Sequence, residues 1–256
     1  MLTTLVLLAG GESRRFGRDK SLVLVDGKPS ISRIVDEFTR IGIVNIVVVS
    51  KNYEKCKLYK SILPEIECAI DKPLECGGPL RGIYSVGDRG SKYYYLVPVD
   101  TPWIEPRAYV VLSSYLDVYS ADIASPLYGD KYVDPLISVI SSTYFSQLHS
   151  RVERICSLRG SLRATDLLRI ASTVVLVGSR HLTRLSYTLS HINTENDLKI
   201  RPPRGILVDD VVVIKQPSLG LASSHDELRG ISTQQYNVYK NLGIEHLATH
   251  AERDSM

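Results

Sequence analysis

The sequence predicts an α/β fold, a layered sandwich built around a mostly parallel sheet. Residues 2–8 (LTTLVLL) and 43–50 (IVNIVVVS) are short apolar runs. Neither alternates apolar with polar residues, as expected of strands that are buried on both faces. Between them, apolar residues follow Pro29-Ser30 at the spacing of one helical face: Ile31, Ile34, Val35, Phe38 and Ile41. A strand, a helix and a second buried strand predict a right-handed parallel crossover.

The same alternation continues through the next 150 residues or so. Short strands are predicted at 67–70, ending in Asp71, at 93–99, ending at Asp100, and at 173–177. Gly129-Asp130 between 121–128 and 134–140 is typical of a hairpin. Helices are expected at 82–87, 106–116 and 161–170, and residues 194–197 resemble a capping box that opens another.

The length of 256 residues fits one large domain, or one domain with an appendage. The character of the chain changes after Pro202-Pro203, so we expect a boundary near residue 200, with residues 201–256 as a C-terminal extension. There, residues 205–214 are β-like, 216–225 are loop-like and 232–250 are expected to form a terminal helix.

Composition excludes several classes of protein. The net charge of +3 gives no argument for nucleic-acid or membrane binding. No segment approaches the roughly 20 apolar residues that a membrane span needs. Residues 1–8 are apolar but short and lack a basic leader, so we expect no signal peptide and a cytoplasmic protein.

The cysteines and histidines do not show the spacing of metal ligands. Cys56, Cys68, Cys76 and Cys156 contain no C-x-x-C pair, which leaves zinc-ribbon and thioredoxin interpretations unsupported. Free thiols are the simplest expectation, and a disulfide among the four is not assignable. The six histidines are scattered, so no zinc site is expected.

Three notable sequences follow predicted strands: residues 10–20, Asp71 and Asp100. Parallel α/β sheets bind ligands at the carboxyl ends of their strands, so these sequences are expected to form one site. The first is the most informative, since residues 8–20 read LAGGESRRFGRDK. Glycines let backbone amides approach an anion, Lys20 offers a point charge to phosphate, and Arg15 a forked contact.

This segment fits neither the P-loop pattern nor the dinucleotide fingerprint. A basic surface turn is the alternative interpretation. However, the segment resembles L-A-G-G-x-S-x-R-x-G-x-D-K, the signature of nucleotidyltransferases related to molybdenum cofactor guanylyltransferase, with Phe16 where methionine is usual. Five further stretches resemble later family motifs in collinear order: residues 27–29 (GKP), 78–82 (GPLRG), 99–103 (VDTPW), 134–136 (DPL) and 192–194 (INT).

The resemblance covers about residues 1–200 and implies a Rossmann-like three-layer fold. It implies transfer of a nucleoside monophosphate from a triphosphate, with release of pyrophosphate. Positions that match the family would bind the nucleotide, with Lys20 on the phosphates and magnesium on Asp100: Leu8, Ala9, Gly10, Gly11, Lys20, Asn52, Asp71 and Asp100. Arg15, Lys20 and Asp100 are the expected catalytic residues.

Several of these residues have a structural alternative. Asn52 and Asp71 are also typical of turn caps. Asp100 ends an apolar strand, where a carboxylate is costly unless it is paired or metal-bound. Magnesium favours one or two carboxylates plus phosphate oxygens. Asp134 is either a second acidic group near the metal or part of the hairpin, and we favour the hairpin. Arg81 replaces a residue that is usually small.

The resemblance implies GTP as donor and molybdopterin as acceptor, with the acceptor phosphate attacking the α-phosphorus. The family's acceptor motif N-V-N-T reads HINT here, with His191 in place of asparagine. Other acceptors stay open: cobinamide phosphate, a sugar phosphate or phospholactate, with CTP or GTP. A catalytically inactive nucleotide-binding module and an interaction scaffold are further alternatives.

Residues 201–256 are candidates for binding a partner protein or for self-association. Five arginines give either a basic face for an anionic pterin phosphate or a partner protein, or a solvated helix surface: Arg151, Arg154, Arg159, Arg163 and Arg169.

Overall fold

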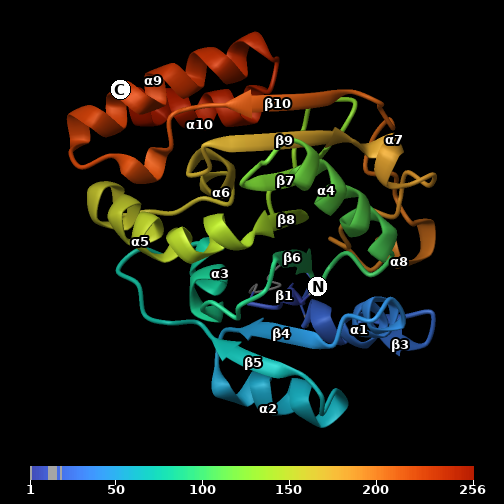
Figure 1. Cartoon of the computed structure of the whole chain (residues 1–256). Coiled ribbons are helices and arrows are strands. Elements are labelled where there is room, and N and C mark those ends of the chain that lie inside the picture. The colour runs from blue at the N-terminus through green and yellow to red at the C-terminus, as the bar shows by residue number, and fades with distance from the viewer. Residues whose placement is uncertain (1, 11–15, 18) are drawn as a thin grey trace.

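A computed structural model of the chain describes residues 2–10, 16–17 and 19–256. In this part of the chain, an eight-stranded sheet runs in the order β10-β9-β7-β8-β6-β1-β4-β5, from top to bottom in Figure 1. Six strands are parallel, whereas β8 and β10 run antiparallel to their neighbours. The strands are β1 (Thr3–Leu8), β4 (Asn45–Ser50), β5 (Glu67–Ile70), β6 (Tyr93–Pro98), β7 (Ile123–Leu127), β8 (Ser138–Ser141), β9 (Thr173–Gly178) and β10 (Val211–Lys215). The predicted α/β fold with a mostly parallel sheet is confirmed.

Helices cover both faces of this sheet and make the sandwich three layers thick. Neighbouring residues of β1 point to opposite faces, with Val6 in one buried cluster and Leu5 and Leu7 in the other. The face of Val6 packs against α3 (Leu80–Val86), α5 (Ser142–Arg159), α6 (Asp166–Arg169), α9 (His225–Asn241) and α10 (Glu245–Ser255). The other face packs against α1 (Ser30–Arg40), α2 (Tyr53–Ile62), α4 (Pro106–Val118) and α7 (Ser179–Leu182). Among the described residues, no helix combines the length and the apolar character that crossing a membrane requires.

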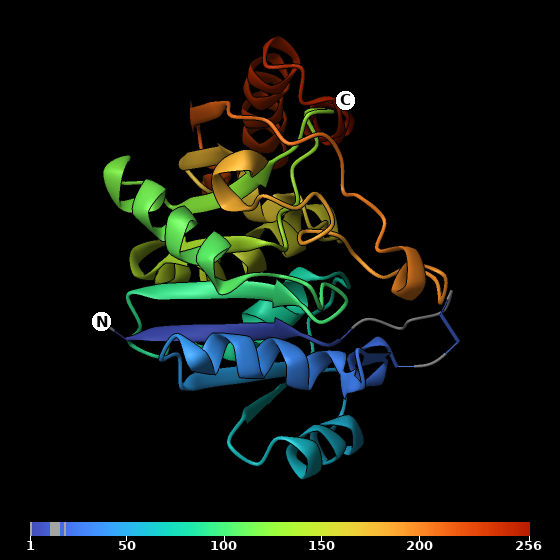
Figure 2. The same ribbon diagram turned by 90° about the vertical axis from the view of Figure 1, so that its right-hand side faces the viewer.

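Smaller elements lie near the carboxyl ends of the central strands. A two-stranded sheet of β2 (Leu24–Val25) and β3 (Lys28–Pro29) follows the short 3-10 helix η1 (Lys20–Leu22). Figure 2 shows the segment after α7, including α8 (Asp197–Ile200), descending beside these blue elements. Arg201 fixes this approach, since its Nη2 lies 3.0 Å from Oδ1 of Asp26. Two segments far apart in sequence therefore meet at this edge.

One predicted helix is wrong in extent. The sequence predicts a helix over 161–170, but within that range only α6 (Asp166–Arg169) is helical. The long helix of this region is α5, which ends before it at Arg159. Gly160 adopts the left-handed conformation and ends α5. Beyond it, the backbone N–H of Leu162 donates to the carbonyl of Gly77 at 3.3 Å instead of to a helical partner. A long-range contact thus replaces the local hydrogen bonds that the spacing predicts.

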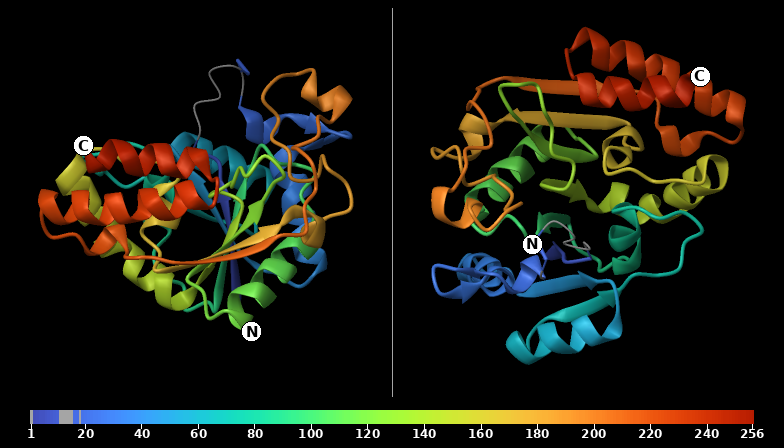
Figure 3. Two further views of the ribbon diagram at one scale, coloured as in Figure 1. Left: turned by 90° about the horizontal axis from the view of Figure 1, so that it is seen from above. Right: turned by 180° about the vertical axis from the view of Figure 1, so that it is seen from behind.

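The C-terminal extension continues the sheet. Its strand β10 pairs antiparallel with β9, and its helices α9 and α10 lie side by side against the same core (Figure 3). The single terminal helix expected over 232–250 is wrong, because the chain turns at Gly243, whose φ is +71°. The 3-10 helix η2 (Leu219–Leu221) precedes α9. The boundary near residue 200 stays a prediction, although sheet and core both run across it.

The expectation of free thiols is also wrong. Cys56 on α2 pairs with Cys68 on β5, and Cys76 pairs with Cys156 on α5. The Cα atoms lie 5.9 Å and 5.7 Å apart, within the range that a disulfide spans. Both pairs join segments that only the fold brings together.

Candidate active site at the carboxyl ends of the central strands

A cavity of about 530 Å³ opens where the central strands end. Leu8, Ala9 and Gly10 enter it from β1, Lys51 follows β4, Asp71 follows β5 and Asp100 follows β6. Parallel strands direct all these residues to one edge of the sheet. Gly10 and Lys20, from the first of the three predicted sequences, therefore meet Asp71 and Asp100 in one cavity.

Lys20 and Asp100 form an ion pair on one wall of this cavity. Nζ of Lys20 lies 2.9 Å from Oδ2 of Asp100, and the two side chains are only 16% and 21% exposed. Burial alone would raise the pKa of Asp100. The adjacent charges and hydrogen bonds of His191 and Lys20 outweigh burial and lower this pKa to about 2. Asp100 is thus an ionised carboxylate beside a cation.

His191 holds the other oxygen of Asp100. Its Nδ1 lies 2.8 Å from Oδ1 of Asp100, and its Nε2 lies 2.6 Å from Oδ2 of Asp134. Burial would lower the pKa of His191, but the two carboxylates raise it to about 10. Asp134 does lie in the connection between β7 and β8, as favoured from the sequence, and it also reaches the site through this imidazole.

A separate network holds Lys20 in place. The preceding Asp19 caps η1, because its Oδ1 accepts a hydrogen bond from the backbone N–H of Ser21 at 3.0 Å. Its Oδ2 accepts from the hydroxyl of Tyr59 at 3.0 Å and lies 2.8 Å from Nζ of Lys55. Both partners come from α2, so this helix anchors the segment that carries Lys20.

Asp71 occupies the opposite part of the cavity. Its Oδ1 is shielded from solvent and has no hydrogen-bond partner in the described part of the chain. A Cβ at Gly10 or Gly82 would lie 3.6–3.8 Å from this carboxylate, so the two glycines flank it closely. Burial raises the pKa of Asp71, and the charges of Arg81 and Lys51 offset only part of that rise.

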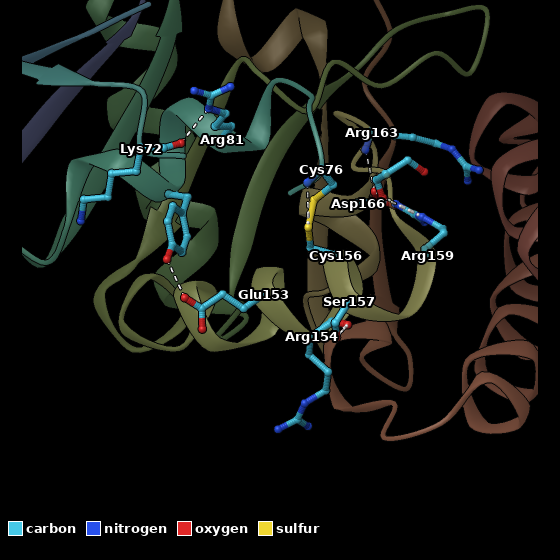
Figure 4. The surroundings of a disulfide bond; sticks show 12 residues. Lys72, Cys76, Arg81, Glu153, Arg154, Cys156, Ser157, Arg159, Arg163 and Asp166 are labelled. Carbon is cyan, nitrogen blue, oxygen red and sulfur yellow. Dashed lines mark hydrogen bonds and ion pairs between the residues drawn. A yellow bond between two sulfur atoms is a disulfide. The ribbon is translucent and has the colours of Figure 1, made fainter. Parts of the chain in front are cut away.

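The Cys76–Cys156 disulfide joins the segment between Lys72 and Arg81 to α5 (Figure 4). It ties the segment before Gly78 and Pro79, which line the cavity, to α5. Gly78 has a φ of +131°, and a Cβ there would clash with the carbonyl oxygen of Leu162. At Gly78 in the GPLRG motif, two backbone segments approach so closely that only glycine fits.

Most of the predicted nucleotide-binding positions lie together. Those that line the cavity are Leu8, Ala9, Gly10, Lys20, Asp71 and Asp100. Asn52 is not among the lining residues, and its Oδ1 caps α2 by accepting from the backbone N–H of Lys55. Gly11 and Arg15 lie outside the described residues.

Sequence reasoning missed two contributions to this cavity. Lys51 lines it although Asn52 was the predicted residue of that stretch. His191 was noticed only as a departure from a motif, yet it contacts both acidic groups. Its position next to the INT motif was the one available signal.

Comparison with known proteins identifies a family for this chain. Residues 5–179 match the MobA-like NTP transferase domain family. The chain is 26% identical over 200 residues to a probable molybdenum cofactor guanylyltransferase of Pyrococcus horikoshii, covering 76% of this chain and 96% of that protein. A protein of the same description from Thermococcus sibiricus is 24% identical over 194 residues, covering 76% and 94%.

A crystal structure of molybdopterin-guanine dinucleotide biosynthesis protein A from Archaeoglobus fulgidus supports the fold. It superposes with a TM-score of 0.63 at 22% identity, covering 78% of this chain and 96% of the other. The family match extends over most of the sheet and over the strand ends that form the cavity. The chain therefore belongs to the MobA-like NTP transferase family and is a nucleotidyltransferase.

Proposed function

We propose that the protein transfers GMP from GTP to the phosphate of a molybdopterin-type acceptor and releases pyrophosphate. The observation that carries this proposal is the convergence of Lys20 and Asp100 beside the glycine at the end of β1. A cation and a carboxylate are among the groups that a metal-bound triphosphate needs. The choice of GTP and of the acceptor rests on the descriptions of the two archaeal relatives.

Magnesium fits the residues at Asp100. This ion takes one or two carboxylates together with phosphate oxygens and water, so it needs no cage made entirely of protein ligands. The described residues contain no group of three His, Cys, Asp or Glu side chains that could hold a metal, so phosphate oxygens and water would have to supply the ligands beyond Asp100. When bound, magnesium would polarise the α-phosphate and neutralise charge on the leaving group.

The side chains would act by positioning and by charge. An oxygen of the acceptor phosphate attacks the α-phosphorus, and the bond from this phosphorus to the bridging oxygen of the β-phosphate breaks. Lys20 would leave Asp100 to contact the phosphates and stabilise the negative charge that collects on pyrophosphate. No general base is required, since a phosphate monoester is already anionic near neutral pH.

Pyrophosphate release tests this function. The purified protein would be incubated with GTP, CTP, ATP or UTP, with and without Mg²⁺, and with molybdopterin or another phosphate acceptor. We expect release only with GTP, Mg²⁺ and molybdopterin together. Release that prefers CTP, or that requires a sugar phosphate, cobinamide phosphate or phospholactate, would replace the proposed substrates. Tight GTP binding without release under any condition would indicate a binding module.

A further inference from the structure

Arg81 is a charged side chain at a place where the family's motif has a small one. It is the second residue of α3 and lines the cavity. Figure 4 shows its guanidinium group beside Lys72, whose carbonyl accepts from Nε at 2.7 Å. Its Nη2 lies 3.5 Å from the carbonyl of Asp71. One edge of the guanidinium is thus anchored on the backbone, and Nη1 makes no hydrogen bond within the described residues.

The neighbouring carboxylate supplies the opposite chemistry. Asp71 carries an oxygen that is shielded from solvent and unpaired in the part of the chain that the structure describes. A buried acceptor without a donor is costly, so a ligand that offers N–H groups would be favoured there. The N–H groups of Arg81 and the oxygens of Asp71 therefore form a donor–acceptor pair on one wall.

This pair lies far from the reacting phosphorus. Asp71 directly follows β5 and Asp100 lies two residues after β6, and β4 and β1 lie between those strands. Three strand spacings place the two strand ends about 14 Å apart. A nucleotide whose α-phosphate lies beside Asp100 would extend its base toward Asp71 and Arg81.

We propose that Arg81 is a specificity-determining residue that selects guanine, an inference that rests on the proposed function. Guanine presents N7, O6, N1–H and N2–H₂ in succession along its edge. Arg81 would donate to O6 and N7, while Asp71 accepts from N1–H and N2–H₂. Adenine carries an amino group where guanine has O6. The N–H donors of Arg81 would therefore meet another donor instead of an acceptor.

Nucleotide affinity without acceptor tests this assignment and does not depend on turnover. The variants are Arg81→Ala and Arg81→Lys, with Arg154→Ala as the matched control, since Arg154 is an exposed arginine of α5. We expect Arg81→Ala to weaken GTP binding about 10-fold to 100-fold and ATP binding less than about 3-fold. Arg81→Lys should resemble Arg81→Ala because lysine lacks the fork, and Arg154→Ala should bind like the wild type.

The probe 7-deaza-GTP, which lacks N7, separates base recognition from support of the loop. The wild type should bind it more weakly than GTP, and Arg81→Ala should bind both equally. Equal losses for GTP and ATP in Arg81→Ala, or a 7-deaza penalty that persists without Arg81, would overturn the assignment. A wild type that prefers CTP would instead refute GTP as the donor, so the two failures are distinguishable.

Discussion

Nδ1 of His191 lies 2.8 Å from Oδ1 of Asp100, and the opposite nitrogen of the same ring lies 2.6 Å from Oδ2 of Asp134. The imidazole therefore joins a carboxylate just after β6 to one in the connection between β7 and β8. The backbone N–H of Ile192 also donates to the carbonyl of Asp100 at 2.7 Å. The segment that follows α7 is thus held against the strand end that carries the expected metal ligand.

Removing His191 tests this connection. His191→Ala would leave Asp134, which is 4% exposed, without its ionic partner. We expect the free energy of unfolding to fall by about 3–5 kcal/mol, because a buried charge loses its compensation. The double variant His191→Ala/Asp134→Asn should lose less than the sum of the single variants, with a coupling of about 0.5–3 kcal/mol in urea unfolding. Strict additivity would show that the bridge contributes nothing.

Much of the fold could be predicted because its signals are local. The runs in β1, β4 and β9 consist of residues that favour buried strands, and the turn chemistry after them marks where each strand ends. Since parallel strands end at one edge, the sequence alone was enough to place Asp71 and Asp100 in one site. The capping role of Asn52 is also local, and it was the alternative interpretation of that residue.

What escaped prediction depends on contacts between distant segments. His191 meets Asp100 across 91 positions, and Cys76 meets Cys156 across 80. The helix expected over 161–170 is shortened because Leu162 bonds to Gly77, which no local pattern encodes. Periodicity cannot report such partners, since it describes only one segment at a time.

Asp100→Asn tests the expected metal ligand. Asparagine keeps the shape but removes the charge, so we expect kcat to fall by about 10²-fold to 10³-fold with GTP and Mg²⁺. In an exposed ion pair, Nζ of Lys28 lies 2.6 Å from Oδ2 of Asp36. Asp36→Asn is therefore the matched control, and its activity should be near that of the wild type. Circular dichroism should show both variants folded. Near-normal turnover in Asp100→Asn would refute the metal assignment.

The two disulfides are controls for one another. Cys76→Ser/Cys156→Ser opens a crosslink across 80 residues, and Cys56→Ser/Cys68→Ser opens one across 12. In the chain-entropy model these losses are about 4–5 and about 3 kcal/mol of unfolding free energy. The first pair supports the Gly78 wall directly, whereas the second reaches the site only through α2 and β5, so removal of the first pair should raise KM for the triphosphate more. An equal rise of KM in both variants would contradict that role.

The ion pairs of Asp254 should make the stability of the protein depend on pH. It lies 3% exposed among Arg169, Arg159 and Arg163, and it fastens α10 to α6 and the end of α5. Burial would raise the pKa of Asp254, but Arg169 and Arg159 outweigh it and hold this pKa below the ordinary value of 3.8. Its contribution to stability is therefore complete above about pH 4 and is lost as the pH falls through the lowered pKa.

Asp254→Asn should then cost about 3–5 kcal/mol of unfolding free energy at pH 7, because three arginines lose a buried partner. The difference from the wild type should shrink as the pH falls below about 4, since the wild-type carboxyl also becomes neutral. Urea unfolding at pH 7, 4 and 2.5 measures both effects. Asp209→Asn, in an exposed pair with Arg180, is the control and should change stability by less than about 1 kcal/mol. A difference for Asp254→Asn that stays constant with pH would mean that the charge of Asp254 does not hold the C-terminal helix in place.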